Sequence, residues 1–198
     1  RGLATKVEHI AYNAGLDESM MRLPPMGAGD GRECDTLFAY WGRDYRARFD
    51  KSTLPADHVG IESMREWAEF RRGQPGREFT VLEYYNDFWM LTGLFPFLTD
   101  TIAGDMEFYR DMGVDGVMSL IVPPSRRDFP DFDYPYLWVM SVNTRLLLRG
   151  LWDGSLDADR SRADYIAKYH GDSREAALMT RVIEEILPEV SRFNQPLF

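Results

Sequence analysis

Hydrophobic and polar positions follow two different periods along the chain. Four short segments mix β-branched, aromatic and aliphatic residues and stop at Gly, Pro, Asn or Asp, which is typical of β-strands. The third and fourth of these segments are apolar at odd and even positions alike, which predicts strands that are covered on both faces. The predicted strands span residues 7–14, 35–42, 78–85 and 116–124.

Between and after these segments, apolar residues recur at the spacing of amphipathic helices. The second predicted helix is expected to have Thr99 or Asp100 as its N-cap and to stop at Gly113. Pro188 interrupts the last one. The predicted helices span residues 58–73, 99–113, 133–152, 158–170 and 173–193.

Strands and helices that alternate in this way indicate a parallel sheet with right-handed crossover connections. Two architectures fit this order: a doubly wound open sheet and part of a (β/α)₈ barrel. A nucleotide-binding doubly wound sheet usually has a glycine-rich turn after its first strand. Here the only glycine cluster, within 24–35, precedes a strand and contains acids that would repel phosphate. The sequence therefore favours an α/β fold of the barrel type.

The composition limits the partners that we expect. Of the 198 residues, 44% are hydrophobic, which is enough for one sizeable core. The net charge of −9 and the scattered arginines argue against nucleic acid as a partner. No stretch approaches the roughly 18 apolar residues of a membrane span, so no membrane partner is expected. One cysteine excludes an intrachain disulfide, and three scattered histidines predict no metal site.

The chain begins with Arg-Gly-Leu and enters a predicted strand within a few residues. There is no charged, apolar and small-residue layout of a signal peptide at this start. We therefore expect the chain to be a piece of a longer protein. The missing N-terminus would hide any targeting signal, which leaves the localisation open.

Aromatic, amide and carboxylate side chains gather where the first three strands end. In a barrel, the carboxyl ends of the strands converge on one mouth, where catalytic groups lie. Aromatic rings and carboxylates suit a sugar, and glycosidic hydrolysis needs two carboxyl groups astride the bond. The candidate catalytic residues are Glu83, Asp87 and Asp44, and the candidate substrate-binding residues are Tyr12, Asn13, Asp17, Trp41, Tyr84, Tyr85, Asn86 and Trp89.

These candidates have structural alternatives. Glu83 lies in an otherwise apolar strand, where an unpaired carboxylate is costly, so it must pair with a base or lie at the open end of the barrel. Asp44 lies between Arg43 and Arg46, and a local salt bridge would occupy it equally well. Asp87 could cap the segment that follows it. The aromatic candidates could belong to the core, and the amides could bond loop carbonyls.

Five stretches of the chain carry a likeness to a known family. They are HIAYNAGLDESMMRLPP, DTLFAYWGRDYRAR, FTVLEYYNDFW, DMEFYRDMGVDGVMSLI and RLLLRGLWDGSLDADRSRADYIAKYHG, in that order. Together they resemble the carbohydrate-active family known as domain of unknown function 4838. That family is similar to α-glucuronidases and family 20 hexosaminidases in having a (β/α)₈ barrel. Some members are endo-β-N-acetylglucosaminidases of glycoside hydrolase family 163, which act on N-glycans.

The resemblance covers residues 7–171 and is best in YRDMGVDGVM and LLLRGLWD…YIAKYHG, which are structural signatures. It implies strands five to eight of a (β/α)₈ barrel in residues 1–152, with a helical extension in 153–198. In such barrels the general acid commonly follows strand four, which would lie outside this chain. The sequence IVPPSRRDF departs from the polar, glycine-containing loop that often follows the family's last strand.

The resemblance implies part of a glycoside hydrolase that cleaves a glycan or oligosaccharide without a cofactor or a metal. A non-catalytic carbohydrate-binding or interaction scaffold derived from a barrel is the alternative. Half a barrel would leave two unpaired sheet edges. The expected partners are therefore a carbohydrate and either the missing N-terminal half of the barrel or a second copy of the chain.

Overall fold

The structure, a computed structural model, describes residues 8–13, 17–23, 34–87, 97–122, 136–154, 156–171, 174–182 and 185. These residues form a mixed α/β fold with a four-stranded sheet. The strands are β1 (Glu8–Tyr12), β2 (Asp35–Ala39), β3 (Phe79–Asp87) and β4 (Gly116–Val122). The helices are α1 (Pro55–Arg72), α2 (Thr99–Met112), α3 (Tyr136–Trp152), α4 (Ala158–His170) and α5 (Arg174–Arg181), with short 3₁₀ turns η1 (Glu18–Met21) and η2 (Phe49–Lys51).

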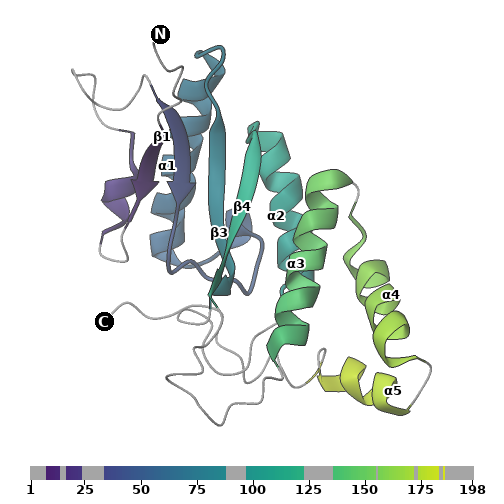
Figure 1. Ribbon diagram of the computed structural model, residues 1–198. Helices are drawn as coiled ribbons and strands as arrows, with labels where there is room; N and C mark the ends of the chain where they lie inside the picture. Colours follow the sequence, from purple (N-terminus) through teal and green to yellow (C-terminus); the bar gives the residue numbers. More distant parts are fainter. Residues whose placement is uncertain are drawn as a thin grey trace.

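The four strands are parallel and lie side by side in the order in which they occur along the chain (Figure 1). The predicted parallel alternation of strands and helices is therefore confirmed. Each strand pairs with the next one, without the reversal of order that defines a doubly wound sheet. This arrangement is compatible with half of a (β/α)₈ barrel.

The core lies between one face of the sheet and the helices that pack on it. Trp67 of α1 is fully buried, and its ring lies 5.4 Å from the ring of His9 on β1. Its indole N–H donates a hydrogen bond of 2.8 Å to the Met21 carbonyl oxygen, which ties η1 to α1. Phe38 of β2 and Phe79 of β3 meet edge to face on the same side. We call this the helix face of the sheet.

The opposite face, which we call the open face, keeps much of its apolar surface exposed. Ile10 of β1 is 56% exposed, and Leu120 of β4 is 38% exposed. Met118 of β4, which pairs with Leu82, is 52% exposed. The prediction that the fourth strand is covered on both faces is therefore wrong for the part of the chain that the structure describes.

Helix α2 differs from its prediction at one end and agrees at the other. Its N-cap is Leu98, and Thr99 is already the first helical residue. The Thr99 hydroxyl accepts a hydrogen bond from Arg162 at 3.3 Å, so neither Thr99 nor Asp100 caps the helix. Gly113 ends the helix with φ of 79°, in the left-handed region that favours glycine. The predicted glycine stop is therefore confirmed.

Replacing Gly113 with alanine is expected to lower the free energy of unfolding by about 1–2 kcal/mol. No atom lies within 4 Å of the place where a Cβ would stand, so the cost comes from the left-handed backbone alone. Gly73, which ends α1 with φ of −83°, is the matched control, and Gly73→Ala should cost less than about 0.5 kcal/mol. Urea denaturation of both variants measures the difference, and equal losses would contradict the prediction.

Candidate functional site

Strand β3 sends its side chains alternately to the two faces of the sheet. Glu83 and Tyr85 turn to the helix face, where they contact residues of α2. Tyr84 turns to the open face, where it lines a hollow. The candidates that are neighbours in the sequence are therefore divided between two clusters on opposite sides of the sheet.

The first cluster is built around the buried Glu83 carboxylate. Arg43 Nη1 donates to Glu83 Oε1 at 2.6 Å, and the Tyr45 hydroxyl donates to Oε2 at 2.6 Å. The Tyr109 hydroxyl of α2 donates to Oε1 as well. Burial and then the Glu83 charge raise the pKa of Tyr45 and Tyr109 well above the usual value, so both phenols stay protonated donors.

Asp105 of α2 binds the other side of the Arg43 guanidinium. Arg43 Nη2 lies 2.9 Å from Asp105 Oδ2, and the Tyr85 hydroxyl donates to the same oxygen at 2.8 Å. The Phe49 backbone N–H donates to Oδ1 at 2.8 Å. Burial raises the pKa of Asp105 to about 7, because Arg43 only partly offsets it and Glu83 adds to it. We call Arg43, Glu83 and Asp105, with the tyrosines that bind them, the buried ion cluster.

The sequence leaves two places for Glu83: paired with a base, or at the open end of a barrel. The geometry supports the first, a structural ion pair. The Glu83 side chain is 3% exposed, and both oxygens are already bound to Arg43, Tyr45 and Tyr109. It lies on the helix face, and the hollow of the open face does not include it. Tyr85 belongs to the same buried ion cluster.

The second cluster lies on the open face, where β1, β2 and β3 end. A hollow of about 460 Å³ is lined there by aliphatic side chains of the sheet and by three aromatic residues. Tyr12 ends β1, Trp41 follows β2, and Tyr84 and Asp87 come from the end of β3. We call these four residues the rim. The structure therefore brings together four of the predicted site residues from three consecutive strands.

A bulge in β3 places Asp87 on the rim. Glu83 pairs with Ser119 and Asn86 pairs with Ile121, so three steps along β3 match two along β4. The extra residue reverses the alternation of faces beyond it. Asp87, which by strict alternation would face the helices with Glu83, lines the hollow of the open face.

Hydrogen bonds hold the rim in place. The Asn13 side chain binds the Trp41 backbone at both ends, with Nδ2 donating to the carbonyl at 2.8 Å and Oδ1 accepting from the N–H at 3.0 Å. The Trp41 indole Nε1 then donates to Asp87 Oδ2 at 2.9 Å. Asn13 is thus a positioning residue, and the indole fixes the orientation of the carboxylate.

Tyr84 and Tyr12 form the aromatic wall of the rim. Tyr84 is 4% exposed, whereas Tyr12 is 36% exposed and offers its ring to a ligand. Burial raises the pKa of Tyr84 above its usual range, and a hydrogen bond with Tyr12 contributes to this rise. The Tyr84 hydroxyl is therefore a neutral hydrogen-bonding group.

The remaining predicted site residues lie elsewhere. Asp44 binds the Arg46 guanidinium at 2.8 Å and the Arg46 backbone N–H at 3.0 Å, which is the local salt bridge that its flanking arginines allow. Asp17 caps η1 by accepting from the Ser19 N–H at 2.8 Å, and hydrogen bonds from the Ser19 side chain and then its backbone lower the pKa of Asp17. Asn86 Nδ2 donates to Thr144 of α3 at 3.0 Å. Trp89 lies outside the described residues.

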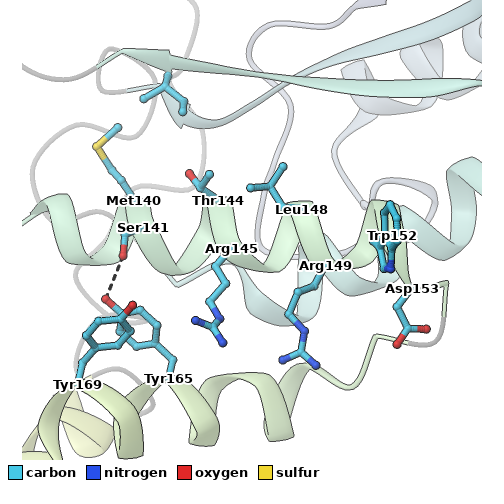
Figure 2. A pocket seen from close by; sticks show the side chains of 11 residues that line it. Met140, Ser141, Thr144, Arg145, Leu148, Arg149, Trp152, Asp153, Tyr165 and Tyr169 are labelled. Atoms are coloured by element: carbon cyan, nitrogen blue, oxygen red, sulfur yellow. Dashed lines mark hydrogen bonds between the residues drawn. The ribbon is translucent and has the colours of Figure 1, made fainter.

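Sequence reasoning missed the residues that bind Glu83 and a larger groove between the helices. A signal for the first was available, because Asp105 interrupts the apolar stripe that Ile102, Met106 and Tyr109 form along α2. The groove has a volume of about 1050 Å³ and is lined by α3, α4 and the end of β4 (Figure 2). Arg145 and Arg149 of α3 point toward α4 in it.

Comparison with protein-family models, with curated proteins and with solved structures finds no match for this chain. Within the described residues, no three His, Cys, Asp or Glu side chains are arranged to hold a metal ion. The helices of that same part of the chain lack the combination of length and apolarity that crossing a bilayer requires.

The Glu83→Gln variant is expected to lose about 3–5 kcal/mol of unfolding free energy, because it leaves Arg43 buried with one charge partner fewer. Glu107→Gln is the matched control, since Glu107 is 56% exposed and pairs with Arg48 at the surface. It should cost less than about 1 kcal/mol. Chemical denaturation of both variants measures their unfolding free energies. A loss in Glu83→Gln as small as that in Glu107→Gln would show that Glu83 does not stabilise the fold.

The raised pKa of Asp105 predicts a pH dependence of stability. The unfolded chain releases this proton at about pH 4, whereas the folded protein keeps it to about pH 7. The stability that Asp105 contributes is therefore complete below about pH 4 and is lost as the pH rises through 7. Between pH 5 and 7, wild type should lose up to about 1 kcal/mol per pH unit more than Asp105→Asn.

Thermal unfolding at several pH values measures this slope. The control is Asp111→Asn, which removes an exposed carboxylate from the same helix and should leave the slope of wild type unchanged. Parallel pH profiles for wild type and Asp105→Asn would show that Asp105 is ionised throughout this range in the folded protein.

Proposed function

We propose that the chain is the C-terminal half of a (β/α)₈ barrel and that its rim binds a carbohydrate. Three features support the barrel. The strand order follows the chain, the connecting helices α1 and α2 lie on one side of the sheet, and the opposite face is apolar and open (Figure 1). In a complete barrel that open face becomes the packed interior.

The rim is the observation that carries the proposal of a sugar ligand. Tyr12, Trp41 and Tyr84 come from three neighbouring strand ends and surround one hollow, with Asp87 beside them. Flat rings can stack on the apolar face of a pyranose, while the carboxylate and the Tyr84 hydroxyl can bind its hydroxyl groups. The carboxyl ends of parallel strands are also where barrel enzymes bind their substrates.

In the hydrolytic version of this proposal, Asp87 supplies one of the two carboxyl groups that glycoside cleavage needs. The Trp41 indole holds it in a fixed orientation, as a nucleophile or an acid–base group requires. Among the described residues that line the hollow, Asp87 is the one acid. The general acid would come from the other half of the barrel, as the likeness to glycoside hydrolase family 163 implies.

A non-catalytic carbohydrate-binding scaffold is the second candidate function. The observation that favours it is the fate of the other candidate acids, since Glu83 is bound to Arg43 and Asp44 to Arg46. A site with one carboxylate binds a sugar but lacks the second group for cleavage. The two functions therefore differ in whether a second carboxylate reaches the rim from the other half of the barrel.

Either function calls for a partner at the sheet. In the described part of the chain, β1 and β4 each pair with one strand and form the two edges of the sheet. Unpaired edges recruit further strands. The N-terminal half of the barrel would pair with both edges and cover the open face, and a second copy of the chain is the alternative.

Sugar binding is tested by isothermal titration of the intact protein with a panel of N-glycans and oligosaccharides. Tyr12→Ala should weaken binding by about tenfold or more, equivalent to about 1.4 kcal/mol, because Tyr12 offers the most exposed ring of the rim. Tyr12→Phe keeps the ring and should retain most of the affinity. Leu178→Ala, which removes a 57% exposed apolar side chain from α5, is the control. Unchanged affinity for the sugar in Tyr12→Ala would exclude the rim as the binding site.

Aryl-glycosides distinguish the two functions. If the protein hydrolyses them, Asp87→Asn should lower turnover at least roughly 100-fold, the range of a lost acid–base group, while sugar affinity changes far less. Turnover near that of wild type in Asp87→Asn would exclude Asp87 from the chemistry. Binding by wild type without any turnover would favour the scaffold.

A further inference from the structure

The groove between α3 and α4 contains a buried polar atom, Arg145 Nε, that has no partner in the described part of the chain. Its floor is α3, and Tyr165 and Tyr169 of α4 form one side of it (Figure 2). Ile121 of β4 also lines it. Arg145 and Arg149 lie one helical turn apart on that floor. The volume of about 1050 Å³ is at the upper end of what small-molecule sites have.

The Nε of Arg145 is buried and has no hydrogen-bond acceptor in the described part of the chain. A buried donor of this kind costs the protein stability unless a partner binds it. The guanidinium donates hydrogen bonds in a fixed fork and accepts none, so the partner must be an acceptor, best of all an oxyanion.

Arg149 is a second cationic side chain in the groove and also favours an anionic ligand. Its Nη1 lies 3.9 Å from Asp164, at the limit of an ion pair, and both side chains are largely exposed. Like charges four residues apart on a helix repel each other. Two neighbouring guanidinium groups therefore face one groove that a single carboxylate, that of Asp153, also lines, in a chain whose net charge is −9.

Two tyrosines of α4 give the groove an aromatic wall, against which a ring of the ligand can pack. The Tyr165 and Tyr169 rings lie 4.6 Å apart, and Tyr165 is fixed by a hydrogen bond of 3.0 Å to Ser141. Tyr169 is 56% exposed, and Lys168 Nζ lies 5.4 Å from the centre of its ring, which places a further cation beside the aromatic pair. Leu148, which also lines the groove, is exposed and points to the side of α3 away from α4 (Figure 2).

We propose that this groove binds a small organic anion: a ring that carries a phosphate or a carboxylate group. The oxyanion accepts hydrogen bonds from Arg145 and Arg149, and the ring packs against the aromatic pair of α4. The site is separate from the rim, because it lies between α3 and α4 and shares no lining residue with the hollow of the open face. The proposal of an anion site is therefore independent of the proposed sugar binding.

Isothermal titration of the full chain with phenyl phosphate, benzoate, inorganic phosphate and phenol tests the proposal. Phenyl phosphate or benzoate should bind saturably, and whichever binds more tightly identifies the oxyanion. Inorganic phosphate, which lacks the ring, and phenol, which lacks the charge, should bind at least about tenfold more weakly. No saturable binding of either ring anion up to about 10 mM would overturn the proposal.

Arg145→Gln should weaken binding of the preferred anion by about tenfold or more, the range of a lost charge-assisted hydrogen bond. Arg160→Gln, an exposed arginine of α4 outside the groove, should bind like wild type. Arg145→Gln should unfold at the temperature of wild type or above it, because it removes a buried Nε that has no acceptor in the described chain. Unchanged affinity, or a clear loss of stability, would show that Arg145 serves the fold instead.

Discussion

The fold depends on one guanidinium group, that of Arg43, which is held away from water between two carboxylates. Arg43 follows β2, Glu83 belongs to β3 and Asp105 to α2, so two ion pairs of one arginine join three segments of the chain. The Tyr45 and Phe49 rings lie 4.4 and 4.5 Å from the guanidinium and exclude solvent from it. Because one unpaired charge here would be strongly destabilising, these segments must assemble together.

The buried ion cluster also determines where the rim lies. Glu83 anchors β3 on the helix face, and the next residue along the strand, Tyr84, then faces the opposite side. The same strand therefore supplies both the support and part of the site. Rigid support of this kind is what a binding or catalytic group needs if it is to stay in one orientation.

The order of the elements could be predicted from the sequence because it depends on local patterns. Strand segments, helical spacing and the left-handed stop at Gly113 are each determined by a few neighbouring residues. The pairing of Glu83 with Arg43 could not, because the sequence shows that a buried carboxylate needs a partner but not which of many arginines reaches it. The groove at Arg145 depends on how α3 and α4 pack, which no single segment encodes.

The bulge in β3 has an evolutionary consequence. Since one extra residue decides which face of the sheet Asp87 occupies, a single codon gained or lost between Glu83 and Asn86 would exchange the two sides of the strand end. Related chains could thus acquire or abandon an acidic group at the strand ends in one step, while the ionic support beneath stays intact. Among such chains, differences in chemistry should therefore be sought in insertions at the β3 bulge more than in substitutions.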